Sequence, residues 1–137
     1  MSDATTAVLL RALLALFVLR VAGQVIVALR APSWLPAMKQ WYSGLIPYPV
    51  LLPIQLVFVA VMAAIASDVG RGTGVFAGAG PSWGRFLVGF AVVYAAAMAV
   101  RYARWRRTPP ELRRAWIPIP FHVVLAAFIG VYGWWLL

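Results

Sequence analysis

Five of the polar side chains inside the long apolar stretches of this 137-residue chain are best placed to do chemistry at membrane depth. They are Arg20, Gln24, Gln55, Tyr94 and His122. Arg20 and Gln24 are four residues apart, so they share one face of a helix. A guanidinium binds anions through a planar fork of donors, and a glutamine amide both donates and accepts hydrogen bonds. The set could therefore bind the polar head of an amphiphile.

Three interpretations of these five residues are open, because a polar group in hydrocarbon is expensive and needs a reason. The first is a hydrogen-bonded network that holds the helices in register. The second is a binding site for a polar headgroup, a quinone or a lipid. The third is exposure at an interface with another protein.

Most enzyme chemistries lack their residues in this sequence, which has one histidine, three acidic residues and no cysteine. A single histidine excludes a two-histidine metal site or bis-histidine haem ligation within one chain. Asp3, Asp68 and Glu111 fall outside the apolar stretches, so neither paired-carboxylate nor serine-triad catalysis is supported. We expect no catalytic residue, no metal site and no cofactor, although a quinone or a haem shared with another chain stays an alternative.

The composition indicates a membrane protein, since 64% of the residues are hydrophobic and 11% are charged. A soluble domain has about 45–50% apolar and about 25% charged residues. Four apolar stretches approach the length of about 20 residues that a helix needs to cross a bilayer. They cover residues 7–29, 49–67, 86–103 and 117–137. Backbone groups in lipid must pair within their own segment, so we predict one all-α domain, a four-transmembrane-helix bundle.

The distribution of positive charge predicts an orientation. Eight of the twelve basic residues lie in the first and third loops, whereas Arg11, Arg71 and Arg85 lie on the opposite side. The positive-inside rule places these two loops in the cytoplasm and both termini outside, most simply in a bacterial cytoplasmic (inner) membrane. In this orientation Gln24, Gln55 and His122 fall in the cytoplasmic half, and Arg20 lies just deeper.

The net charge of +9 would indicate nucleic acid in a soluble protein, but here the arginines flank apolar stretches. We therefore expect anionic lipid headgroups, and no nucleic acid, as the partner of the third loop, with a docking site for an acidic partner as the alternative. The arginines concerned are Arg104, Arg106, Arg107, Arg113 and Arg114.

The first and second loops have distinctive compositions. The first contains the aromatic residues Trp34, Trp41, Tyr42 and Tyr48, which prefer the level of the headgroups. It is expected to lie on the membrane surface or to form a lid over a cavity between helices. The second loop, residues 68–83, is rich in glycine and is expected to be a flexible, solvated connection.

Small residues at helical spacing predict where helices pack, because close backbone contact holds helices together in lipid. The third stretch has Ala91, Ala95, Ala99 and Ala103, and the fourth has Ala126, Gly130 and Gly133. The same faces could receive helices from other membrane subunits or from a second copy.

The sequence leaves three functions open and favours a non-enzymatic protein. The first is an accessory or assembly subunit of a larger membrane complex. The second is binding or transport of an amphiphilic or anionic ligand, such as a lipid or quinone, at the polar cluster. The third is a quinone- or haem-associated membrane anchor of a redox complex, in which His122 would be one axial ligand.

Overall fold

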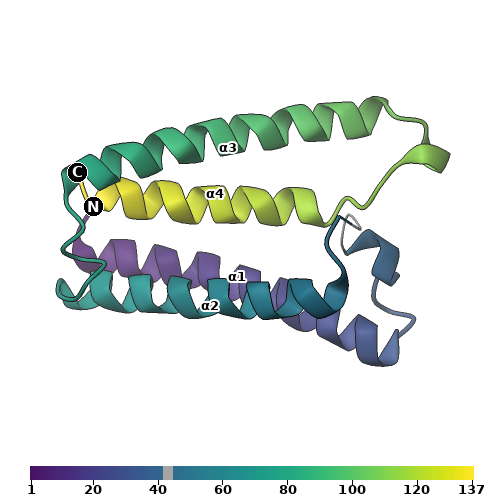
Figure 1. Cartoon of the computed structure of the whole chain (residues 1–137), viewed down its shortest axis with the longest axis horizontal. Coiled ribbons are helices and arrows are strands. Elements are labelled where there is room, and N and C mark those ends of the chain that lie inside the picture. Colours follow the sequence, from purple (N-terminus) through teal and green to yellow (C-terminus); the bar gives the residue numbers. More distant parts are fainter. Residues whose placement is uncertain (42–44) are drawn as a thin grey trace.

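The computed structural model describes residues 1–41 and 45–137, and this part of the chain is helical with no strand (Figure 1). The long helices are α1 (Asp3–Arg30), α2 (Tyr48–Arg71), α3 (Pro81–Arg107) and α4 (Pro118–Trp135). Two short 3₁₀ turns, η1 (Met38–Gln40) and η2 (Pro110–Leu112), lie in the first and third loops. Each long helix is long and apolar enough to cross a membrane, which confirms the predicted four-helix membrane fold.

The first three helices begin earlier and end later than the apolar stretches, and at α1 a polar cap explains the earlier start. At the start of α1, the Ser2 hydroxyl accepts a hydrogen bond from the Thr5 backbone N–H at 3.2 Å, and Asp3 lies in the first turn. Both features stabilise a helix N-terminus through its unpaired N–H groups and its dipole. At the other end Ala31 adopts a left-handed conformation, and Pro32 follows it.

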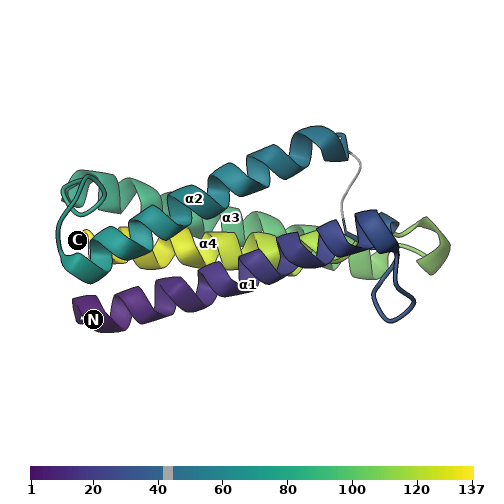
Figure 2. The same ribbon diagram turned by 90° about the horizontal axis from the view of Figure 1, so that it is seen from below.

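The four helices do not contact one another equally. α1 packs against both α2 and α4, whereas α3 packs mainly against α4 and lies at the edge (Figure 1). The α1–α2 and α3–α4 connections lie at one end of the bundle, and both termini and the α2–α3 connection lie at the other. Seen from below, the start of α2 diverges from the end of α1 (Figure 2).

The main core lies between α1, α2 and α4. Leu10 and Phe17 of α1, Met62 and Val69 of α2, and Phe128 of α4 are all buried there. These helices therefore form the compact part of the bundle, and they hold the polar residues of α1 and α2 in fixed positions.

α3 and α4 touch closely at one end only. A Cβ atom at Gly84 would lie 2.7 Å from the Gly133 carbonyl oxygen, and one at Gly130 would lie 3.3 Å from the Ala91 Cβ. Toward the other end the two helices separate and leave a groove of about 730 Å³, which we call the α3–α4 groove (Figure 1). Ala91 is buried in the close contact, Ala95 and Ala99 line the groove, and Ala103 is exposed.

The α2–α3 connection is organised around one carboxylate. Asp68, in the last turn of α2, accepts hydrogen bonds from Arg71 at 2.8 Å and from the Phe76 backbone N–H at 3.1 Å. Gly74 has a φ of 114° and lies so close to this carboxylate that a side chain there would collide with it. The Phe76 carbonyl in turn accepts a hydrogen bond from the Tyr132 hydroxyl at 2.7 Å, which ties the turn to α4. The glycines of this loop thus allow a tight turn, rather than only a solvated connection.

The placement of the loops gives a direct test of orientation. We expect reporters fused after Leu137 or within residues 70–80 to report the external side, and fusions within residues 106–114 to report the cytoplasm. The physical reason is the concentration of arginine at the end that carries the first and third loops. The reverse pattern would contradict the orientation.

The close contact of α3 and α4 predicts a difference between two glycines of one helix. Gly84→Ala should lower the free energy of unfolding by about 1–3 kcal/mol, because the new methyl group overlaps the α4 backbone. Gly89→Ala should leave it unchanged or raise it by up to about 1 kcal/mol, since nothing lies within 4 Å of that position. Unfolding by added SDS in mixed micelles measures both, and equal effects would contradict the assigned contact.

Candidate functional site

The structure joins three of the five sequence-predicted polar residues into one buried network between α1 and α2. Arg20 is 7% exposed, Gln55 is 4% exposed and Gln24 is fully buried. Arg20 Nη1 donates to Gln24 Oε1 at 3.2 Å, and Gln55 Nε2 donates to the same oxygen at 3.1 Å. The side-chain oxygen Oε1 of Gln24 is therefore the shared acceptor that connects the two helices.

Trp41 of the first loop completes this network. Arg20 Nη2 donates to the Trp41 carbonyl oxygen at 3.0 Å, and the Trp41 indole N–H donates to the Pro36 carbonyl at 2.9 Å. The indole ring packs on Gly23, where a Cβ atom would lie 2.5 Å from the ring. The first loop thus folds back against α1, and its Trp41 carbonyl holds the second terminal nitrogen of the guanidinium.

Sequence reasoning did not give Trp41 this role. Trp34, which is 75% exposed, has the accessibility of a surface aromatic residue, but Trp41 is only 7% exposed. The available signal was Gly23 beside Gln24, a gap on α1 that fits a large ring, although nothing in the sequence identifies which ring fills it. Tyr42, which we expected in the same interfacial segment, lies outside the described residues.

Tyr94 and His122 form a separate pair between α3 and α4. The Tyr94 hydroxyl shares a hydrogen bond with His122 Nδ1, and the two ring centroids are 5.8 Å apart. His122 is on the same face of α4 as Ala126, Gly130 and Gly133, and this face is directed toward α3. The Tyr94–His122 pair therefore has no direct hydrogen bond to the Arg20 network within the described part of the chain.

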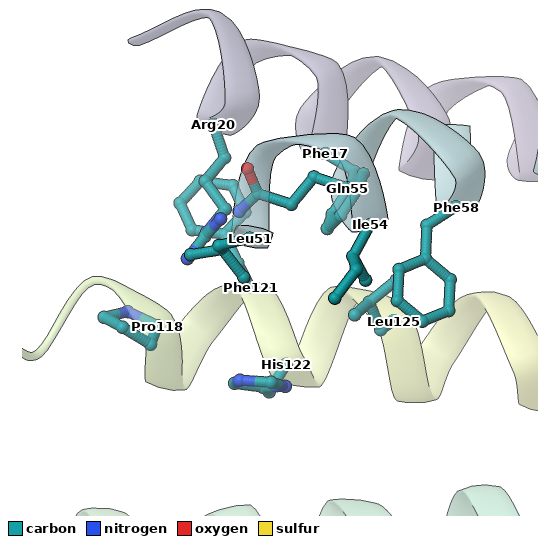
Figure 3. A pocket seen from close by; sticks show the side chains of 10 residues that line it. All are labelled: Phe17, Arg20, Leu51, Ile54, Gln55, Phe58, Pro118, Phe121, His122 and Leu125. Atoms are coloured by element: carbon teal, nitrogen blue, oxygen red, sulfur yellow. The ribbon is translucent and has the colours of Figure 1, made fainter. Parts of the chain in front are cut away.

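Arg20 and His122 both line two adjoining cavities, which we treat together as the inner and outer parts of the Arg20 recess; Figure 3 shows the residues of the inner part. Its inner part, of about 100 Å³, is mostly apolar, with Phe17, Phe58 and Leu125 in its wall. Its outer part, of about 320 Å³, includes Tyr94 and Arg101 of α3. Arg20 and His122 line both parts, together with Leu51 and Pro118. Figure 3 shows the Arg20 side chain extending from α1 toward α4, where Phe121 and Pro118 lie.

The charge of Arg20 has no carboxylate beside it. Among the described residues the only ion pair is Arg71–Asp68, at the other end of the bundle. Asp3 accepts a hydrogen bond from the Trp135 indole at that same end, and Glu111 lies in η2. Both acceptors of Arg20 are neutral, and Arg101 adds a second positive charge to the recess. The lining of the recess therefore includes two arginines and no acidic residue, which makes its potential positive.

The network also contains unused hydrogen-bonding groups. Gln24 Nε2 and Gln55 Oε1 are buried without a partner among the described residues. Most buried polar atoms in folded proteins have a partner, so each such group stands out. The described part of the chain contains no cluster of three or more histidine, aspartate or glutamate side chains that could hold a metal ion.

The structure divides the five arginines that we assigned to lipid headgroups into two groups. Arg104, Arg113 and Arg114 line a second recess of about 450 Å³ beside the third loop, together with Arg101. Arg106 and Arg107, in the last turn of α3, are exposed and lie outside it.

The shared acceptor predicts unequal costs for two similar substitutions. Gln24→Met should destabilise the protein by about 2–4 kcal/mol, because it leaves buried donors of both Arg20 and Gln55 unpaired. Gln55→Met should cost about 1 kcal/mol or less, because Gln24 keeps its bond to Arg20 and an unpartnered oxygen is removed. The free energy of unfolding in mixed micelles measures both. Equal costs would show that Gln24 is not the shared acceptor.

Comparison with protein-family models, curated proteins and solved structures finds no match for this chain. The assignment therefore rests on the residues and geometry of the chain itself. Four helices that can each span a bilayer establish a small polytopic membrane protein.

Proposed function

We propose that this membrane protein binds an anionic amphiphile, with the charged head against Arg20 and the alkyl chain in the inner part of the Arg20 recess. The observation that carries the proposal is a guanidinium only 7% exposed, at membrane depth, with neutral acceptors alone and a cavity in front of it. An anion bound there would supply the counter-charge that the chain does not provide.

The surroundings of Arg20 fit a head that carries oxygen atoms. Gln24 and Trp41 each bind one terminal nitrogen of the guanidinium, so its direction is set before a ligand arrives. A pre-oriented planar fork binds a carboxylate or phosphate with little further loss of side-chain freedom. A neutral quinone would leave the charge uncompensated, so the geometry favours an anionic head over a quinone.

The shape of the recess fits a single chain. The outer part is lined by residues of all four long helices and the first loop, and the inner part lies between Phe17, Phe58 and Leu125 (Figure 3). Few polar groups and a mostly apolar wall are typical of sites for amphiphilic small molecules.

A second candidate function, an accessory subunit of a larger membrane complex, is favoured by the exposure of α3. Over its most apolar 18 residues 6% of α3 is buried, compared with 33% of α4. A helix from another subunit would cover this face. The mass of the protein purified in mild detergent, together with any co-purifying chain, tests this function, and an absorption spectrum of the same sample would reveal a bound haem.

Replacement of Arg20 tests the binding function. Laurate is a suitable probe, and native mass spectrometry in a neutral detergent measures the bound fraction. Arg20→Leu should lower laurate affinity by about tenfold or more, because a charge-assisted hydrogen bond contributes about 1.5–3 kcal/mol. Arg20→Lys should restore part of the binding, since lysine keeps the charge but not the planar fork.

The matched control is Arg30→Leu, which removes an exposed arginine from the last turn of the same helix. It should leave laurate binding unchanged. Full binding by a stably folded Arg20→Leu protein would contradict the proposed function.

A further inference from the structure

The third loop and the end of α3 build a second positively charged cavity, which we call the arginine recess. Its volume is about 450 Å³, and the side chains of Arg101, Arg104, Arg113 and Arg114 line it. Glu111 does not line it. The proposed function makes no use of this recess apart from Arg101, which borders both cavities.

The arginine recess has a fixed frame. The Arg113 guanidinium lies 4.5 Å from the centre of the Trp105 ring and donates to the Thr108 and Arg106 carbonyls at 3.0 and 3.2 Å. The Trp105 indole N–H donates to the Arg114 carbonyl at 3.0 Å. Arg113 thus holds the loop against the end of α3, where it also pairs the last carbonyl groups of the helix.

The other arginines of the recess are available to a ligand. Within the described residues, the side chains of Arg101, Arg104 and Arg114 make no hydrogen bond or ion pair, whereas that of Arg113 does. Arg104 and Arg114 are exposed, and Arg101 is half-buried. Converging guanidinium groups without a carboxylate are the usual protein partner of a phosphate.

The arginine recess adjoins the α3–α4 groove. Trp105 and Ile119 line both, so the charged and apolar cavities share a wall. From these residues the groove runs along α3 past Tyr102 to Ala99 and Ala95. The small alanine side chains keep the groove open in the part of α3 that crosses the hydrocarbon.

We propose that the arginine recess and the adjoining α3–α4 groove together form a binding site for an anionic two-chain phospholipid taken from the bilayer. The phosphate lies among Arg101, Arg104 and Arg114, and one acyl chain lies in the α3–α4 groove. Charge complementarity favours this ligand, because a cavity lined by arginines adjoins an apolar groove. Trp105 lies between the two, as expected of a tryptophan at the level of the lipid headgroups. This site shares Arg101 with the Arg20 recess, but Arg104, Arg114 and the α3–α4 groove belong to it alone.

The headgroup part of the proposal is tested with two double variants of equal charge. The protein is reconstituted in vesicles of phosphatidylglycerol and phosphatidylcholine, extracted in mild detergent, and its retained lipid is measured by native mass spectrometry. Arg104→Gln with Arg114→Gln should lower retained phosphatidylglycerol by about tenfold, since each removes a cation near the phosphate. Arg106→Gln with Arg107→Gln, outside the recess, should change it by less than about twofold.

The groove is tested in the same assay with two alanines of α3. Ala99→Phe fills the groove and should reduce phosphatidylglycerol retention, whereas the exposed Ala97→Phe, outside the groove, should not. Helix content and the elution volume of each variant confirm its fold. Added inorganic phosphate should not displace the lipid, because it cannot occupy the groove.

Four results would overturn the proposal. Equal losses in the two arginine pairs would show diffuse attraction to the membrane surface, and equal retention of phosphatidylcholine would show that charge does not select the ligand. Displacement by inorganic phosphate would assign the recess to the free anion. If the protein forms a dimer without bound lipid, and Ala99→Phe dissociates that dimer, the groove would be assigned to a second copy of the chain. Arg20→Leu should keep its phosphatidylglycerol, so failure of this site and failure of the Arg20 site are distinguishable.

Discussion

A buried positive charge with no carboxylate beside it is the constraint on which the rest of this structure depends. Arg20 lies in an apolar helix, and the acidic residues of the chain lie elsewhere. The protein supplies neutral acceptors from Gln24 and from the Trp41 carbonyl. These bonds satisfy donors of the guanidinium and orient it, but they leave its charge for another partner.

Several features outside the network follow from this arrangement. The first loop must fold back toward α1 for Trp41 to reach Arg20, and Gly23 leaves the space for its ring. Gln55 must face α1, which sets the rotation of α2 about its own axis. α1 and α2 diverge at this end but pack on α4 through a shared apolar core at the other (Figure 2). The Arg20 recess lies beyond the shared apolar core, toward the end at which α1 and α2 diverge.

α3 shows the same contrast between close and open packing. Gly84 and Gly133 bring α3 and α4 into backbone contact, and from there the two helices separate toward the third loop (Figure 1). The alanines that continue along α3 therefore border a groove instead of a second helix. In the proposed phospholipid site this groove receives an acyl chain, and the arginines at its end bind the phosphate.

The amino-acid sequence by itself determined that the chain lies in a lipid bilayer and how many helices cross it. About twenty apolar residues in a row have few alternatives to a membrane helix. It also singled out Arg20, Gln24 and Gln55, since a polar residue in such a stretch is conspicuous. Only the tertiary structure decided which of them meet. Helical spacing gives the face of a residue but not the partner helix, so Tyr94 and His122 separated from the Arg20 network. Trp41 joined that network because a folded loop brings its carbonyl to Arg20, and no local pattern encodes such a contact.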